Sequence, residues 1–366
     1  MKLIHCADLH LDSKMNTHLG SQKAKERKTE LLHTFTRMID YAKDENVKQI
    51  LIAGDLFDTR KVSATASNMV LELIQKNDDI SFYYLRGNHD QNSFIGGMEE
   101  IPANLKLFDE DWTYYRIGGD GDKKICIAAT EASLSDIDLV CRKLSLESEE
   151  VNIVLMHGQE AGSGSADGVI PLKELRNKNI DYLALGHVHF YKKAELDARG
   201  VYCYPGCLEG RGFDECGEHG FVLVDIDTES GKVQADFIPF ASRKLYEVEV
   251  DVKGCTTTLE VEDKVREVLE KKAIPHKHLL RVCLCGERDC ESEWNLSFIE
   301  KQFEDDYYFF CMKDCSSLKV DYEAFANDVS LKGEFVRKVM QDETLSEEEK
   351  AMVVRCGICA LKGEEF

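Results

Sequence analysis

The sequence of 366 residues predicts an α/β fold in layers, followed by a small α+β capping domain and a helical C-terminus. Three observations support this. Apolar runs bounded by Gly, Asp and Asn recur throughout residues 1–240, and amphipathic helical stretches separate several of them. A strand–helix–strand pattern opens residues 241–318, and residues 319–366 show mainly the helical period. We therefore expect three parts with these boundaries.

The first domain is expected to alternate short buried strands with amphipathic helices. Apolar runs predict strands at 3–7, 49–53, 81–85, 124–130, 151–156, 182–185, 201–203 and 221–226. Apolar side chains at i, i+3, i+4 spacing predict helices at 23–46 and 63–75, and a third is expected at 133–146. Ligands bind outside the carboxyl ends of strands in open sheets of this type. Polar residues directly after the apolar runs are therefore candidates for a site.

The second half is expected to be smaller and simpler. Strands at 244–252 and 278–286 enclose an amphipathic helix at 259–272. Near the C-terminus, one helical stripe is formed by Leu331, Phe335, Val339 and Met340. A capping box of Ser346 and Glu349 opens a last helix that runs through residue 361. The stripe has two equal interpretations, docking of a partner protein or packing against the chain's own small domain.

The composition limits the classes of function. There is no apolar run of 18 residues, so we expect no membrane span, and the polar N-terminus leaves no room for a signal peptide. The 14 cysteines are then expected to be reduced thiols in a cytoplasmic protein, with a structural zinc site disfavoured. A net charge of -22 argues against a broad basic surface. A nucleic acid would need a local basic patch, bound metals or a partner subunit.

Five short motifs follow the expected strands and carry the chemistry. They contain seven candidate metal ligands: Asp8, His10, Asp55, Asn88, His157, His187 and His189. Taken singly, each motif has an ordinary interpretation as a polar turn, a helix cap or a buried histidine. Seven ligands at matching strand ends are too many for one ion and suit two ions that share one ligand. Mixed oxygen and imidazole donors favour Mn²⁺, with Fe²⁺, Mg²⁺ and Zn²⁺ as alternatives. Such pairs of ions serve in-line attack on phosphate esters.

The motifs D-x-H, G-D, G-N-H-D, H and G-H-x-H resemble those of the calcineurin-like metallophosphoesterase superfamily. Residues 5–11 and 54–58 resemble the SbcD-like DNA repair exonucleases, and residues 206–214 are similar to the shorter YhaO-like branch. The resemblance implies a β-sandwich of two sheets flanked by helices (αββα) over residues 1–240. It also implies that a DNA-capping domain follows.

The resemblance assigns roles to individual residues. One metal would take Asp8, His10 and His189, and the other would take Asn88, His157 and His187, with Asp55 bridging both. His89 would stabilise charge on the phosphate or protonate the leaving oxygen. Asp58 and Asp90 are candidates for hydrogen bonds to ligand histidines, although solvated turn carboxylates are equally expected there.

The expected activity is a DNA nuclease in DNA repair, with exonuclease activity as the main expectation and endonuclease activity as an additional one. Candidate DNA-binding residues are Arg86, Arg60, Lys61 and Lys14, of which Arg86 is the strongest. The resemblance implies an SbcC-like, SMC-type ATPase as partner, and a homodimer is possible. A small-molecule phosphodiesterase or nucleotidase shares every metal motif, and the acidic composition favours it, but the extra domain disfavours it. A scaffold that has lost activity is disfavoured by the intact ligand set.

Overall fold

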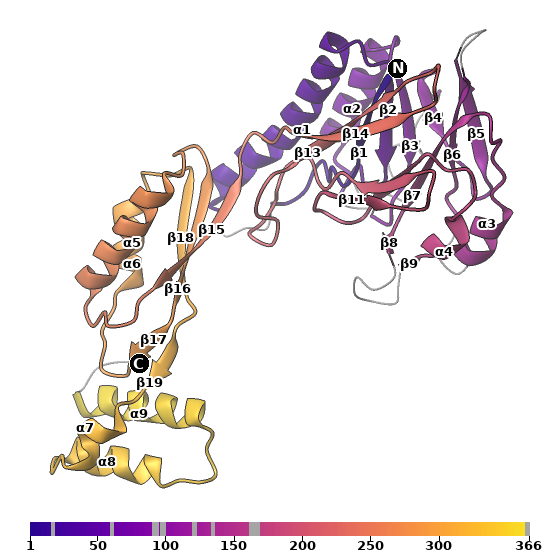
Figure 1. The fold of residues 1–366 in the computed structure, drawn as a ribbon. Coiled ribbons are helices and arrows are strands. Elements are labelled where there is room, and N and C mark those ends of the chain that lie inside the picture. Colours follow the sequence, from indigo (N-terminus) through magenta and orange to yellow (C-terminus); the bar gives the residue numbers. More distant parts are fainter. Residues whose placement is uncertain are drawn as a thin grey trace. The chain divides into compact units, whose positions relative to one another are not determined.

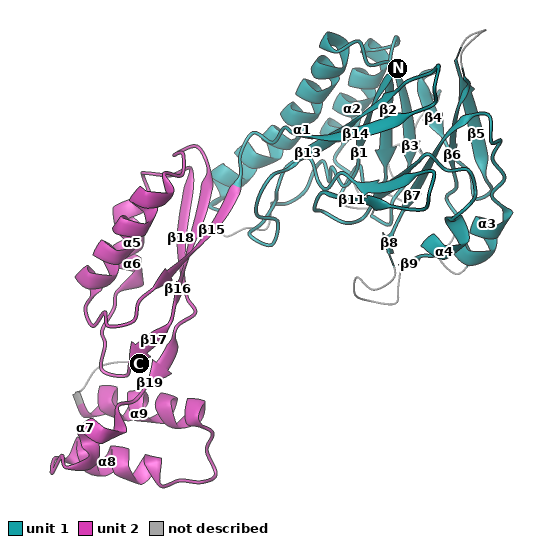
Figure 2. Cartoon of the chain, in the orientation of Figure 1, with its two compact units in different colours: residues 1–244 teal, residues 245–366 magenta. Residues whose placement is uncertain are grey.

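The computed structural model describes residues 1–15, 19–58, 62–89, 95, 100–118, 123–132, 136–160 and 169–362. The chain forms two compact units, Met1–Lys244 and Leu245–Phe366 (Figure 2). No helix in these described ranges is long and apolar enough to cross a lipid bilayer.

The first unit contains two six-stranded sheets (Figure 1). The first has the order β14-β13-β1-β2-β3-β4. Its strands are β1 (Lys2–Cys6), β2 (Gln49–Ala53), β3 (Ser81–Leu85), β4 (Leu105–Leu107), β13 (Gly220–Ile226) and β14 (Val233–Pro239). β1 to β4 run parallel, while β13 and β14 add an antiparallel edge.

The second sheet has the order β11-β12-β10-β7-β6-β5. Its strands are β5 (Thr113–Ile117), β6 (Ile125–Ala129), β7 (Val151–His157), β10 (Tyr182–Gly186), β11 (Lys192–Glu195) and β12 (Val201–Tyr204). β6, β7, β10 and β12 are parallel, and the edge strands β5 and β11 are antiparallel to their neighbours. A two-stranded pair, β8 (Gln159–Glu160) with β9 (Val169–Ile170), follows β7.

Alternate side chains of each strand enter different cores, and this produces four layers. Leu3 and Leu51 of the first sheet pack with Ile153 of the second in a core between the sheets. Their sequence neighbours Ile4 and Ile50 pack on the opposite face, against helices α1 (Ser21–Asp44) and α2 (Ala64–Lys76). The outer face of the second sheet packs against α3 (Ile137–Lys143) and α4 (Leu172–Leu175). The expected αββα sandwich is therefore confirmed.

The second unit has a three-stranded parallel sheet, β15-β16-β18, made by Leu245–Asp251, Leu279–Cys285 and Phe309–Asp314. Helices α5 (Thr258–Lys272) and α6 (Leu296–Phe303) contribute to a core with one face of this sheet. The order of α5 between β15 and β16 agrees with the expected strand–helix–strand pattern. The sequence analysis did not identify α6 or β18.

The C-terminal part of this unit has a separate small core. It contains β17 (Glu287–Asp289), β19 (Ser317–Lys319), α7 (Tyr322–Ala326), α8 (Leu331–Met340) and α9 (Glu347–Lys362). The expected stripe divides: Val339 is buried and Phe335 packs beside it, whereas Leu331 and Met340 are exposed. The side chain of Ser346 accepts the N–H of Glu349, and the Glu349 carboxylate accepts the Ser346 N–H, so the expected capping box is present.

Candidate metal centre

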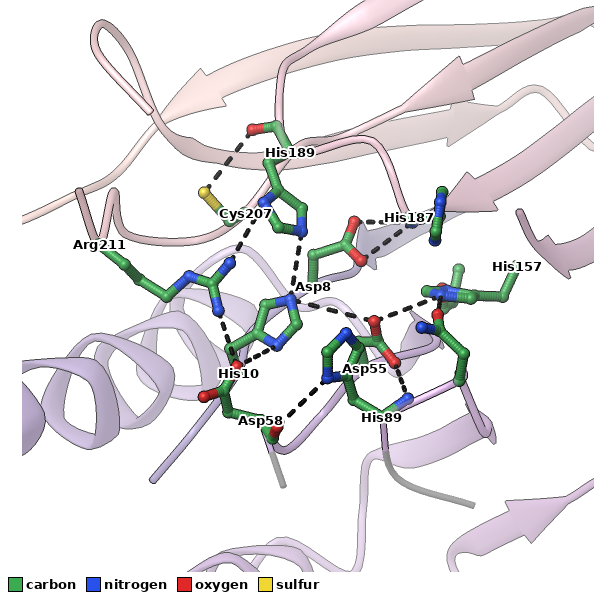
Figure 3. Close-up of polar contacts among 12 residues, drawn as sticks. Asp8, His10, Asp55, Asp58, His89, His157, His187, His189, Cys207 and Arg211 are labelled. Carbon is green, nitrogen blue, oxygen red and sulfur yellow. Dashed lines mark hydrogen bonds and ion pairs between the residues drawn. The ribbon is translucent and has the colours of Figure 1, made fainter. Parts of the chain in front are cut away.

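The five sequence motifs lie at the carboxyl ends of parallel strands in both sheets. Asp8 and His10 follow β1, Asp55 follows β2, Asn88 and His89 follow β3, His157 ends β7, and His187 and His189 follow β10. Because neighbouring parallel strands end at the same edge of a sheet, residues far apart in sequence meet there. The two sheets thus each supply one side of the site (Figure 3).

Unusual backbone conformations hold the site residues in place. The N–H of Asp8 donates to Gly54 O (3.1 Å) and that of His10 donates to Asp55 O (3.0 Å), which joins the loops after β1 and β2. Asp8, His10 and Asp55 have φ angles of 51°, 45° and 50°, in the left-handed region that few residues other than glycine adopt. Such conformations persist where the surrounding structure enforces them, and they cluster at functional sites.

Three glycines leave room for the site's side chains. A Cβ atom at Gly54 would lie 2.1 Å from His157 Nδ1, and one at Gly87 would lie 2.1 Å from Asp55 Oδ1. A Cβ atom at Gly186 would lie 1.9 Å from Ala53 O. These glycines are therefore needed for the close approach of the backbone to the site.

Asp8, His10 and His189 form the first group of possible metal ligands. One ligand atom from each lies within 4.8 Å of the others. The Nε2 atoms of His10 and His189 are 3.2 Å apart. Two imidazoles that bind one divalent ion at about 2.1 Å each place their nitrogens about 3 Å apart, so this separation fits a shared ion.

Asp8, Asp55 and His157 form a second group, in which one ligand atom from each residue also lies within 4.8 Å of the others. His157 Nε2 lies 3.3 Å from Asp55 Oδ2 and 2.8 Å from Asn88 Oδ1. Asp55 Oδ2 also lies 4.0 Å from His10 Nε2, so this carboxylate lies between the two groups. The ring of His187 packs edge-on against that of His157, with centroids 5.3 Å apart.

His89 is exposed at the solvent side of the site. Its backbone N–H donates to Asp55 Oδ1 (2.9 Å), and its Nδ1 lies 3.2 Å from the backbone oxygen of Asp58. The Asp58 side chain lies beside a different imidazole, with Oδ1 3.1 Å from His10 Nδ1. The structure therefore brings His89 to the rim of the ligand cluster, where a substrate has access.

The structure describes two of the four candidate DNA-binding residues, Arg86 and Lys14. Arg86 is exposed, but its backbone N–H and its guanidinium both donate to Glu131 (2.9 and 2.6 Å). Lys14 is exposed. Arg60 and Lys61, together with the candidate acid Asp90, lie outside the residues that the structure describes.

Two residues at the site, Arg211 and Glu215, were not identified in the sequence. Glu215 is buried, and its Oε1 lies 2.7 Å from His189 Nδ1. Arg211 donates to Glu215 Oε1 (2.8 Å) and to Asp58 Oδ1 (2.9 Å), as Figure 3 shows for Asp58. Burial opposes ionisation of Glu215, but His189 and Arg211 outweigh it and hold the pKa of this carboxyl well below its usual range. Both residues lie in a loop without a recognisable ligand motif.

The ligand cluster is strongly polarised in the absence of an ion. Burial alone would raise the pKa of Asp55, but the hydrogen bond with His157 and the charges of His157 and His10 hold it well below its usual range. Burial opposes protonation of His157, yet Asp55 and Asp8 raise its pKa to about 9. Burial and the charge of His157 lower the pKa of His187. The cluster thus attracts positive charge, which a proton supplies here and a metal ion would supply better.

Comparison with known proteins identifies the family of the chain. The family model for calcineurin-like phosphoesterases matches residues 1–191. The uncharacterized metallophosphoesterase YhaO of Bacillus subtilis is 28% identical over 289 residues, covering 75% of this chain and 70% of YhaO.

Two further relatives carry nuclease or DNA repair names. The SbcD component of the nuclease SbcCD of Staphylococcus epidermidis is 24% identical over 309 residues, covering 74% of this chain and 76% of the relative. The DNA double-strand break repair protein Mre11 of Methanopyrus kandleri is 24% identical over 278 residues. That match covers 68% of this chain but only 59% of the relative. The chain belongs to the calcineurin-like phosphoesterase family.

Proposed function

We propose that this protein is a two-metal phosphodiesterase that acts on DNA, a nuclease of the SbcD type that digests from ends and functions in DNA repair. The observation that carries the proposal is the position of Asp55 between two ligand groups, one containing His10 and the other His157. The same oxygen, Asp55 Oδ2, lies near both His10 and His157, while Oδ1 accepts the backbone N–H of His89. A carboxylate oxygen has more than one lone pair and can contact two ions, whereas an imidazole presents one free nitrogen.

In this proposal Asp8, His10 and His189 hold one ion, Asn88, His157 and His187 hold the other, and Asp55 contacts both. When bound, a pair of Mn²⁺ ions lowers the pKa of a water molecule and stabilises negative charge on a phosphoryl group. The protein's own contribution is to fix the donor atoms, and the left-handed backbone at Asp8, His10 and Asp55 does this.

His89 is the residue proposed to act on the substrate directly. It is exposed, and contacts with Asp55 and with the backbone of Asp58 orient it at the rim of the cluster. There it can donate a hydrogen bond to a phosphate oxygen or a proton to the leaving sugar oxygen. An imidazole N–H can serve in either role.

The relatives named for DNA repair and for the nuclease SbcCD support DNA as substrate. The second unit, Leu245–Phe366, supplies further surface that a small substrate does not require. By the same resemblance we propose an SMC-type ATPase as partner.

A small-molecule phosphodiesterase is the second candidate. The net charge of -22 favours it, as does the engagement of Arg86 with Glu131. These two features reduce the positive charge that a DNA backbone would meet.

A parallel substrate assay separates the two candidates. The purified protein would be incubated with Mn²⁺ and either end-labelled duplex DNA or cyclic nucleotides, with and without the co-expressed ATPase. We expect Mn²⁺-dependent shortening of the duplex from its ends, abolished by EDTA. Hydrolysis of the cyclic nucleotides alone, even with the ATPase present, would reject the nuclease proposal in favour of the second candidate.

A further inference from the structure

We propose that Arg211, Asp58 and Glu215 form a clamp that orients His10 and His189, and that this clamp makes their ion position the tighter of the two. The inference rests on the two ion positions of the proposed function and adds an order of occupation to them. The family match ends at residue 191, so it assigns no role to Arg211 or Glu215.

The clamp is arranged around one guanidinium, that of Arg211, which Figure 3 shows beside His10, His189 and Asp58. Asp58 Oδ1 lies 3.1 Å from His10 Nδ1, and Glu215 Oε1 lies 2.7 Å from His189 Nδ1. Arg211 donates through Nη1 to Asp58 Oδ1 (2.9 Å) and through Nη2 to Glu215 Oε1 (2.8 Å). Each of these two carboxylate oxygens therefore contacts both an imidazole and Arg211, and Arg211 Nη2 also lies 3.2 Å from His189 Nδ1.

This arrangement determines which nitrogen of each imidazole is available. A neutral imidazole carries one proton, and a carboxylate beside Nδ1 holds that proton there. The lone pair is then on Nε2, and the Nε2 atoms of His10 and His189 face each other at 3.2 Å. A carboxylate on the far nitrogen also makes an imidazole a stronger donor to a metal ion.

At the second ion position, the far nitrogen of His157 has a neutral partner and Asn88 is itself neutral. The far nitrogen of its ligand His157 lies 3.0 Å from the backbone oxygen of Ala53, which is a neutral acceptor. Asn88, a further ligand of that position, is a neutral amide and is exposed. We therefore expect the position of His10 and His189 to fill first as the metal concentration rises.

Arg211 and Glu215 are joined by more than one hydrogen bond. Glu215 is 3% exposed, and its Oε2 accepts the backbone N–H of Arg211 at 2.7 Å. Arg211 is thus fixed to Glu215 through both its backbone and its side chain. Because these contacts are made within the protein itself, we expect an ion to require little further loss of conformational freedom on binding, and this favours affinity.

Titration of the metal-free protein with Mn²⁺ tests the inference without any substrate. We expect calorimetry to resolve two binding steps in the unaltered protein. Glu215→Gln keeps the shape of the side chain but removes its charge, and it should weaken the tighter step about 10- to 100-fold while leaving the other step unchanged. Asp58→Asn, at a side chain that is 22% exposed, should weaken the same step.

Glu209→Gln is the matched control. Glu209 is also a buried carboxylate in this loop, 1% exposed, but its partners are Arg27, Thr34 and Ser242 rather than an imidazole. The control should lower the melting temperature of the metal-free protein and leave both binding steps unchanged. If Glu215→Gln does not fold, as judged by circular dichroism, Asp58→Asn provides the same test.

Two results would overturn the inference: two equivalent binding steps in the unaltered protein, or equal weakening of both steps by Glu215→Gln or Asp58→Asn. Neither result depends on the substrate, so a failed nuclease assay with ordered Mn²⁺ binding would reject the proposed function and keep the clamp. DNA cleavage by a protein with two equivalent Mn²⁺-binding steps would reject the clamp and keep the proposed function.

Discussion

Asp8 accepts the backbone N–H of His187 on both carboxylate oxygens, each at 2.9 Å. Asp8 follows β1 of the first sheet and His187 follows β10 of the second, so this contact joins the two sheets at the metal centre. One carboxylate oxygen of Asp8 also lies within 4.8 Å of a ring nitrogen of His10 and of His189. The site therefore depends on the packing of the two sheets, because each sheet contributes only part of the proposed set of metal ligands.

Replacement of Asp55 should affect both ion positions at once. Asp55→Asn removes the charge that lies between His157 and His10, and it replaces one of two equivalent oxygens by an amide. We expect phosphodiesterase activity to fall at least about 100-fold, because electrostatic stabilisation of the transition state depends on both ions. Steady-state hydrolysis at saturating Mn²⁺, together with the metal content by atomic emission, measures both effects.

Asp79→Asn is the control for this change, since Asp79 is exposed and pairs with Lys48 at the surface. Its activity and metal content should match those of the unaltered protein. Full activity in Asp55→Asn with two ions retained would show that another group bridges the ions.

Replacement of His89 should separate catalysis from metal binding. His89 is exposed and is not a member of either proposed ligand set, so His89→Ala should leave the Mn²⁺ content unchanged. Loss of its proton or hydrogen bond should lower kcat about 10²- to 10⁴-fold. The exposed His33 on α1 provides a matched His→Ala control that should retain full activity. A loss of metal in His89→Ala would instead indicate a ligand role.

Gly54 should tolerate no side chain. A Cβ atom there would lie 2.1 Å from His157 Nδ1, and the φ angle of +93° is itself unfavourable for alanine. We expect Gly54→Ala to displace His157, weaken Mn²⁺ binding and lower the free energy of unfolding by about 1–3 kcal/mol. At Gly20 nothing lies within 4 Å of the added Cβ atom, so Gly20→Ala should leave both Mn²⁺ binding and the free energy of unfolding unchanged. Urea denaturation of both metal-free variants would measure the difference, and equal stability would show that the loop adapts.

Much of the first unit could be predicted because its strands are buried on both faces. Apolar runs such as residues 49–53 and 182–185 are conspicuous, and β2 and β10 lie there. Edge strands lack this pattern: β11 (Lys192–Glu195) is mostly polar and exposed, and β5 (Thr113–Ile117) is only half buried. Their positions depend on pairing with a neighbouring strand, which local hydrophobicity does not encode.

The sequence analysis identified the metal ligands and Asp58, but it did not identify Arg211 and Glu215, the other two members of the clamp. Asp8, His10, His187 and His189 occur in pairs two residues apart, directly after apolar strands. Arg211 and Glu215 are four residues apart in a loop, where an ion pair is ordinary. Only the folded chain shows that they meet His189, so no pattern in the sequence distinguishes them from solvated charges.

The stability of the metal-free protein should fall as the pH rises from about 6.5 to about 9. Contacts with Asp55 and Asp8 raise the pKa of His157 from 6.5 to about 9 in the folded protein, although burial opposes the shift. The folded state then binds more protons than the unfolded state across this range, so the free energy of unfolding decreases with pH. The decrease should be at most about 3 kcal/mol, and urea denaturation in EDTA at a series of pH values measures it.

Metal binding should reverse this dependence. An ion must displace the proton of His157, so Mn²⁺ binds more tightly as the pH rises, and the stabilisation that it gives grows accordingly. The difference in melting temperature between Mn²⁺ and EDTA should therefore be larger at pH 8 than at pH 6. In His157→Asn the metal-free protein should lose most of its slope over the same range. A slope that is unchanged in this variant would show that another group holds the proton. Stability that rises with pH in EDTA would show that the folded protein does not retain the proton in this range.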